Sequence, residues 1–125
     1  MKKIIIFSLI ILFFAKTQNV FSSTDTFTVD NIEVTGNIGK QNNRNRHLET
    51  AFRKGFEKLI VSIVRAEDQK VLLSTDLKTI KLLVLNYRVI EENTLDNKYN
   101  LKVDIAFNRD LVSQFLFEKN ISYSE

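Results

Sequence analysis

The chain has 125 residues, of which 44% are hydrophobic and 26% are charged. This length and composition indicate one globular domain and exclude a disordered tail. Cysteine and proline are absent and there is a single histidine, which excludes disulfide scaffolds, thiolate metal sites, cysteine nucleophiles and proline-rich linkers. We therefore expect neither a metal nor a cofactor.

The beginning of the chain has the parts of a secretory signal peptide. Lys2 and Lys3 precede an apolar run over residues 4–15, and small residues precede a cut expected after Ser22. A twelve-residue helix spans about 18 Å, whereas the hydrocarbon core of a bilayer needs about 30 Å. We therefore expect residues 1–22 to be a cleaved signal, with an uncleaved anchor as the alternative. This predicts export to the periplasm or the extracellular face of the cell envelope.

Loss of the signal changes the charge of the protein. Three of the 18 basic residues lie in the signal and none of the 15 acidic ones does, so residues 23–125 are neutral. A neutral chain has no electrostatic attraction for nucleic acid. We expect no nucleic-acid partner and, after cleavage, no stable transmembrane anchor.

The mature chain opens with alternating apolar and polar residues, which predict a strand over Phe27–Thr35. The alternation slips at Asp30 and Asn31, and a bulge there would return the apolar residues to one face. The polar residues 37–46 are interpreted as a solvated link and not as an anion-binding loop, because no glycine-rich phosphate motif accompanies them.

Apolar residues at three- and four-residue steps from Leu48 to Val64 predict a long helix of four to five turns. Gly55 interrupts it, and glycine costs about 1 kcal/mol against alanine in a helix. We expect close approach of a neighbouring element to compensate. Glu67 and Asp68 are interpreted as solvated charges in a loop.

A shorter helix is predicted to begin near Ser74–Asp76, which offer capping oxygens. Its buried side is expected to hold Leu77, Ile80 and Val84. The apolar period then changes from that of a helix to that of a strand near Leu85.

The second half predicts a hairpin and a final helix. A polar turn at Thr94–Lys98 separates the strand near Leu85 from a cleanly alternating strand, Tyr99–Phe107, with its odd-numbered residues buried. Asn108 is expected to cap the helix, and Asn120 to end it in a left-handed conformation. The expected inner face of the helix consists of Leu111, Val112, Phe115 and Leu116, and Ile121 and Tyr123 are expected to fold back onto the domain.

The predicted order is β-α-α-β-β-α. This order favours an α/β protein of the α+β type, a two-layer sandwich with a small, mainly antiparallel three-stranded sheet and helices on one face. Residues 23–125 are expected to form this single domain.

The sequence offers no catalytic constellation. His47, at the start of the long helix, is expected to be exposed and without a partner for general base catalysis. Glu91 and Glu92 are adjacent on a strand, so their side chains point to opposite faces and cannot form a dyad. Ser74 has no nucleophile-elbow motif around it. We therefore predict no enzyme and assign no catalytic, cofactor-binding or metal-binding residue.

Five runs nonetheless form a pattern known from other proteins. They are FTVDNIEV at 27–34, RHLETAFRKGFEKLI at 46–60, LNYRVIEEN at 85–93, KYNLKVDIAFNRD at 98–110 and LFEKNISY at 116–123. In this order they resemble the uncharacterised bacterial envelope family catalogued as domain of unknown function 2066. The resemblance implies an exported α+β domain and no mechanism.

The chain departs from that family at one place. Asn43–Arg46 stand where similar sequences have an alanine-rich helix start, so a later start of the helix is expected here. The runner-up resemblance is to the polypeptide-transport-associated domain of outer-membrane assembly proteins, whose opening strand is similar to Ile32–Asn37. That domain lacks the helix predicted after the last strand.

These observations favour an exported, non-enzymatic protein-interaction or assembly module with envelope proteins as partners. The alternative is a small-molecule-binding periplasmic domain with a pocket between sheet and helices, and an enzyme is the third class. An open sheet has free edges to which a partner strand can add. If the hairpin strands occupy the other positions, the first strand, Phe27–Thr35, is the expected docking edge. The alternative, which the sequence favours, is a free edge that binds nothing.

Overall fold

The computed structural model describes residues 25–39 and 43–125. The predicted signal peptide, residues 1–22, lies outside the described residues. The elements are β1 (Thr28–Asn37), α2 (Asn43–Ile63), α3 (Ala66–Leu73), α4 (Leu77–Leu83), β2 (Val84–Leu95), β3 (Lys98–Phe107) and α5 (Arg109–Glu118).

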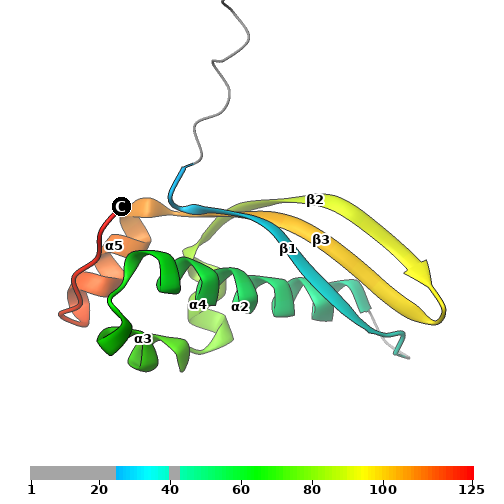
Figure 1. The fold of residues 1–125 in the computed structure, drawn as a ribbon, viewed down its shortest axis with the longest axis horizontal. Coiled ribbons are helices and arrows are strands. Elements are labelled where there is room, and N and C mark those ends of the chain that lie inside the picture. The colour runs from blue at the N-terminus through cyan, green and yellow to red at the C-terminus, as the bar shows by residue number, and fades with distance from the viewer. Residues whose placement is uncertain (1–24, 40–42) are drawn as a thin grey trace, which may run out of the picture.

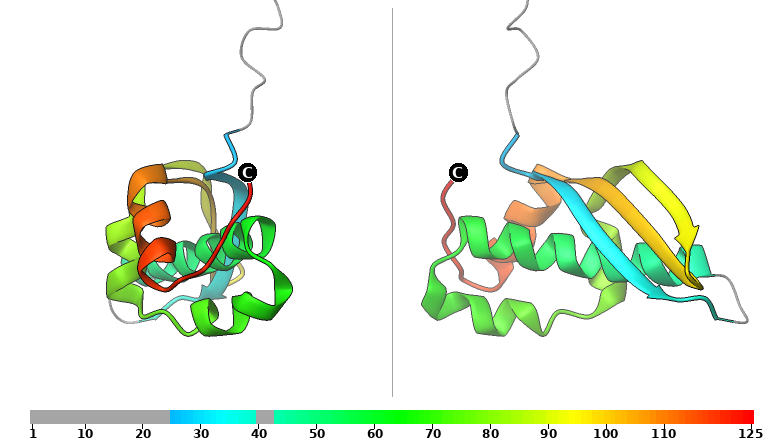
Figure 2. Two further views of the ribbon diagram at one scale, coloured as in Figure 1. Left: turned by 90° about the vertical axis from the view of Figure 1, so that its left-hand side faces the viewer. Right: turned by 45° about the vertical axis from the view of Figure 1, so that its right-hand side comes forward.

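The three strands form one open antiparallel sheet in the order β1-β3-β2, so β1 and β2 are its edges. The long helix α2 crosses one face of this sheet, with α3 and α4 beyond it and α5 at one end (Figure 1). Two further views show the same layering (Figure 2). The predicted α+β class, with an open three-stranded sheet, is confirmed, and the order β-α-α-β-β-α gains one helix, α3.

The predicted bulge in the first strand is confirmed. Val29 pairs with Ile105 and Ile32 pairs with Val103, so two residues of β1 are left over between these pairs. Asn31 has a φ of 57° and its N–H donates to Oδ1 of Asp104 at 2.9 Å. The bulge returns Ile32 to the buried face that Val29 occupies.

The long helix begins at Asn43, so the expectation of a polar link as far as residue 46 is wrong. The expectation of a later helix start is wrong for the same reason. Residues 44–46 form a first turn whose side chains are all exposed. An exposed turn has no apolar stripe, so hydrophobic periodicity cannot detect it.

Glu67 and Asp68 lie in the first turn of α3, so their assignment to a loop is wrong. Carboxylates are favourable at that end of a helix because of the helix dipole, and Arg65 adds an ion pair to Asp68 at 3.3 Å. Leu72 is the single buried residue of α3. A single buried residue gives no recurring apolar pattern, so the sequence did not predict α3.

The shorter predicted helix is α4. Asp76 occupies its N-cap position without a capping bond to the backbone, and Oδ1 of this carboxylate instead accepts a hydrogen bond from the Thr79 hydroxyl at 2.6 Å. Ile80 is buried as predicted. Leu83 is buried as well, whereas Leu77 and Val84 are only half-buried, so the expected inner face is partly wrong.

The hairpin is tighter than predicted. β2 extends to Leu95, and the turn consists of Asp96 and Asn97, whose φ angles are 52° and 60°. Such angles match a two-residue turn that follows the twist of a hairpin. The odd-numbered residues of Tyr99–Phe107 are all buried, as predicted.

The last helix begins and ends as expected. Oδ1 of Asn108 accepts the N–H of Leu111 at 3.1 Å, and Asn120 has a φ of 58°. The Leu111 side chain is 43% exposed, so its placement on the inner face is wrong. The Tyr123 hydroxyl lies 2.6 Å from Oγ of Ser113, which confirms that the tail folds back.

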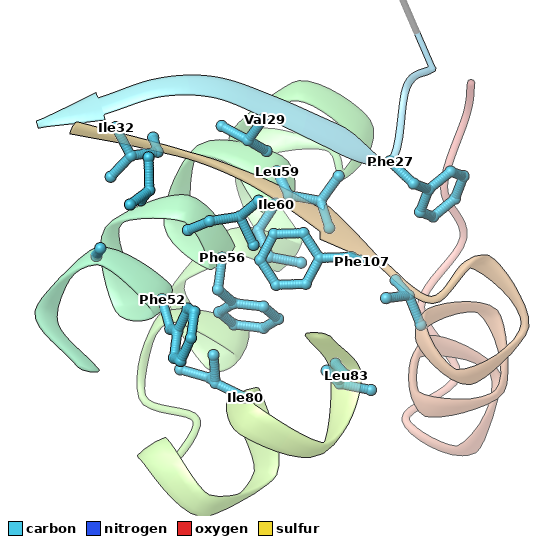
Figure 3. Close-up of a cluster of buried hydrophobic side chains, with 14 of the residues drawn as sticks. Phe27, Val29, Ile32, Phe52, Phe56, Leu59, Ile60, Ile80, Leu83 and Phe107 are labelled. Atoms are coloured by element: carbon cyan, nitrogen blue, oxygen red, sulfur yellow. The ribbon is translucent and has the colours of Figure 1, made fainter. Parts of the chain in front are cut away.

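Between sheet and helices the core is tightly filled (Figure 3). Phe56, Leu59 and Ile60 of α2 meet the sheet, and each is at most 1% exposed. A Cβ atom on Gly55 would lie 2.8 Å from Cδ1 of Ile105. This confirms that close approach of a strand accounts for the glycine in the helix.

Candidate interaction surface

The adjacent carboxylates Glu91 and Glu92 turn to opposite faces of the sheet. Glu91 lies 3.6 Å from Nζ of Lys102 on the outer face, away from the helices. Glu92 pairs with Arg44 of α2 at 3.2 Å and accepts a hydrogen bond from the Tyr99 hydroxyl. The two carboxylates therefore do not converge on one site. Within residues 25–39 and 43–125, no cluster of three or more His, Asp or Glu could hold a metal ion.

His47 is only 5% exposed, so the expectation of an exposed histidine is wrong. Its ring packs edge-on against Tyr99, with the centroids 4.9 Å apart. A Cβ on Gly36 would lie 2.6 Å from Nε2, so the missing side chain of that glycine makes room for the imidazole. His47 precedes the buried Ala51 by four residues, and this spacing is the signal that could have placed it on the inner face.

Tyr99 is held in its neutral form. Burial raises the pKa of Tyr99 to about 12, and the hydrogen bond to Glu92 and the charge of that carboxylate add to the effect. A phenol with such a pKa is protonated at neutral pH and does not act as a base or nucleophile. The Tyr99 hydroxyl therefore serves as a hydrogen-bond donor to Glu92, and its ring packs against His47.

The outer face of the sheet is covered with paired charges. Nζ of Lys102 on β3 lies 3.2 Å from Glu33 of β1 and 3.6 Å from Glu91 of β2, so one ammonium links three strands. The hydrogen bond to Glu33 is the main reason why the pKa of Lys102 is raised. Arg88 pairs with Asp104 at 2.8 Å. Paired charges therefore occupy the centre of this face.

The edge strand β1 is partly closed by the protein itself. Nζ of Lys54, on α2, donates to the backbone oxygen of Glu33 at 3.1 Å. The bulge at Asn31 interrupts the same strand, and its N–H is already bonded to Asp104. A partner strand would find the carbonyl of Glu33 already occupied by Lys54. The predicted docking edge, Phe27–Thr35, is therefore the less open edge of the sheet.

The other edge strand, β2, is open. Ten of its twelve residues are exposed. Four large apolar side chains along it are partly or largely exposed: Leu85 at 60%, Tyr87 at 41%, Ile90 at 44% and Leu95 at 65%. The Tyr87 ring also packs edge-on against Phe52, with the centroids 5.4 Å apart. Monomeric domains usually cover such an edge or place lysine and proline on it.

A second exposed apolar residue group lies at the far end of the molecule. Phe117 of α5 is 81% exposed and borders an open hollow of about 640 Å³ shared with Ile121 and Tyr123. This group has few members, and they do not lie along one strand or along one face of a helix. β2 is thus the longer continuous surface.

Two further results bear on identity. Among the described residues, no helix is both long and apolar enough to cross a membrane. Comparison of the chain with protein-family models, with curated proteins and with solved structures gave no match. The resemblance to the envelope family and to the transport-associated domain therefore stays a prediction.

Proposed function

We propose that the protein is an exported, non-enzymatic interaction or assembly module of the cell envelope, and that it binds other proteins through the edge strand β2. The observation that carries this proposal is the exposure of β2, a twelve-residue edge strand with four large apolar side chains that are partly or largely exposed. Strand addition satisfies the unpaired N–H and C=O groups of such an edge and needs no preformed pocket.

Strand addition also fits the chemistry of the remaining surface. The neighbouring outer face has its charges paired, as in Lys102 with Glu33 and Arg88 with Asp104. A partner therefore gains little from lying flat on the sheet, because exposed pairs are already satisfied and weak. Backbone hydrogen bonds along β2 would supply the affinity, and the side chains that alternate along the strand would supply the selectivity.

The absence of convergent chemistry in the described chain supports a non-enzymatic role. The carboxylates of Glu91 and Glu92 bond to partners on opposite faces, and the ring of His47 is packed against Tyr99. A catalytic group needs a partner and access to substrate. The sequence of residues 1–22 supports export, and the neutral charge of residues 23–125 supports a protein partner over nucleic acid.

The proposal is tested by site-specific photo-crosslinking in cells. A crosslinking amino acid placed at Ile90 should yield adducts with envelope proteins or with a second copy of this chain. The same amino acid at Val61 of α2, which is 59% exposed against 44% for Ile90, is the matched control and should yield few adducts. Equal yields at both positions, or none at Ile90, would refute β2 as the binding surface.

Export is tested on the same sample. Mass spectrometry of the exported protein should give Ser23 as its N-terminal residue, because the predicted cut follows Ser22. A full-length product retained in the membrane would show that the apolar segment acts as an anchor.

A further inference from the structure

We infer that β2 pairs with β2 of a second copy of this chain, antiparallel and about a two-fold axis between Val89 and Ile90. Two three-stranded sheets would then form one sheet of six strands. This inference rests on the proposed function, because it requires β2 to be the interaction surface. It goes further by naming the partner and the register.

The register follows from the regular parts of the strand. β2 runs from Val84 to Leu95, and its ladder to β3 is regular over residues 86–89 and 91–95. Pairing of these parts with a second copy places Asn86 opposite Asn93, and both side chains belong to the outer face. The same register places Arg88 opposite Glu91 of the second copy, twice in the symmetric pair. An isologous contact must be self-complementary in this way.

The faces of the two sheets also agree in that register. Arg88 pairs with Asp104 and Glu91 pairs with Lys102, so both side chains belong to the outer face. In an antiparallel pair, residues directly opposite each other share a face. The Arg88 side chain therefore meets the Glu91 side chain of the second copy.

The charges across the joined sheet then alternate without interruption. Within one copy, Asp104 is bonded to Arg88. Within the second copy, Glu91 is linked to Lys102, and Lys102 to Glu33. Across the axis the row is formed by Asp104 and Arg88 of one copy and by Glu91, Lys102 and Glu33 of the second. Their charges alternate in sign from negative Asp104 to negative Glu33. Opposite charges on facing strands are favourable and like charges are unfavourable, so this register contains no repulsive neighbour in the row.

One of the two bulges of β2 lies at the proposed axis and divides the pairing into two symmetric halves. The ladder to β3 is irregular between Val89 and Glu91, at the position of the axis. On either side lie residues 86–88 and 91–93, which pair regularly with β3, and each of these runs in one copy faces the other run in the second copy. The apolar residues Val89 and Ile90 of the two copies face each other at the axis, where their contact removes apolar surface from water.

Charge reversal with mixing provides the test. The protein purified after export should sediment as a concentration-dependent dimer. Arg88→Glu places Glu opposite Glu91 at two symmetric positions, and Glu91→Arg places Arg opposite Arg88 in the same way. Each variant should dimerise at least about ten-fold more weakly, because two opposite pairs become two like pairs. An equimolar mixture of the two variants restores opposite charges across the axis, so it should recover the dimer.

Recovery of the dimer in the mixture also shows that both variants are folded, because an unfolded variant could not pair with the other one. Lys70→Glu, an exposed charge change on α3, is the matched control and should leave the dimer unchanged. A protein that stays monomeric, or a mixture that dimerises no better than the variants alone, would overturn the inference. Crosslinks from Ile90 to other envelope proteins would persist in that case and would leave the proposed function standing.

Discussion

Replacing Gly55 with alanine tests how closely α2 and β3 pack, because two known effects oppose each other at this position. Alanine in the middle of a helix is about 1 kcal/mol more favourable than glycine. The new Cβ would lie 2.8 Å from Cδ1 of Ile105 and 3.7 Å from the ring of Phe107. Ile105 is fully buried, so its terminal methyl group has little room to move.

The structure sets the expected magnitudes. Overpacking a filled core costs about 1–3 kcal/mol, so Gly55→Ala should lower the free energy of unfolding by about 1 kcal/mol after the helix gain is counted. Ile105→Val removes Cδ1 itself and should cost about 1 kcal/mol alone. In the double variant the alanine methyl fills the space that Cδ1 leaves, so stability should return near that of the unchanged protein.

The assay is a double-mutant cycle by urea unfolding, followed by circular dichroism. The expected coupling between the two changes is about 2 kcal/mol in favour of the double variant. If the losses at positions 55 and 105 simply add, the contact between Gly55 and Ile105 does not restrain the helix. Close approach of β3 would then not be the reason for a glycine in α2.

Three further outcomes are expected. Asn108→Ala removes the oxygen that caps α5 and should lower the free energy of unfolding by about 1 kcal/mol; an unchanged urea midpoint would contradict the cap. Leu59→Asp places a charge at a fully buried position and should abolish cooperative unfolding, whereas the exposed neighbour change Lys58→Asp should be mild; equal effects would show that the buried stripe is misassigned. Because the pKa of Tyr99 is raised from 10.0 to about 12 in the folded protein, its stabilising contribution is present below pH 10 and is lost as the pH rises through 12. Ultraviolet titration of the phenols should show one late ionisation that is missing in Tyr99→Phe.

The parts of the fold that sequence could predict are those with a repeated apolar pattern. The strand Tyr99–Phe107 has a period of two over its whole length, and the helix from Leu48 to Val64 has a period near 3.6, so one buried face follows in each case. The caps at Asn108 and Asn120 were equally predictable. The side chain of Asn108 can accept the hydrogen bond that begins a helix, and asparagine adopts the positive φ that ends one more readily than most residues.

The parts that sequence missed depend on contacts between distant segments. α3 has a single core residue, Leu72, so nothing recurs along it. The burial of His47 depends on the space left by Gly36, eleven positions earlier in the chain and on another element. Leu111 lies one position before Val112, so their side chains point about 100° apart around the helix. Val112 is buried and Leu111 is 43% exposed.

The choice between the two edge strands could not be made from the sequence for a related reason. A sequence shows which strands alternate but not which edge is covered, and β1 and β2 both alternate. Only the fold brings Lys54 to the carbonyl of Glu33 on β1 and leaves ten of the twelve residues of β2 exposed. The strand order, with β3 in the centre, makes both β1 and β2 edges and so allows this difference.

The open edge must still avoid unselective pairing, and the bulges of β2 supply that restriction. The chain has no proline with which to remove an edge N–H, and the exposed part of β2 carries no lysine. The register of β2 against β3 instead shifts twice, after Val84 and after Val89. Each shift breaks the regular spacing of the free edge, so a long unbroken strand cannot follow it. Under the proposed function, a partner would have to match the short runs between the shifts, so β2 would bind more selectively than a flat apolar edge.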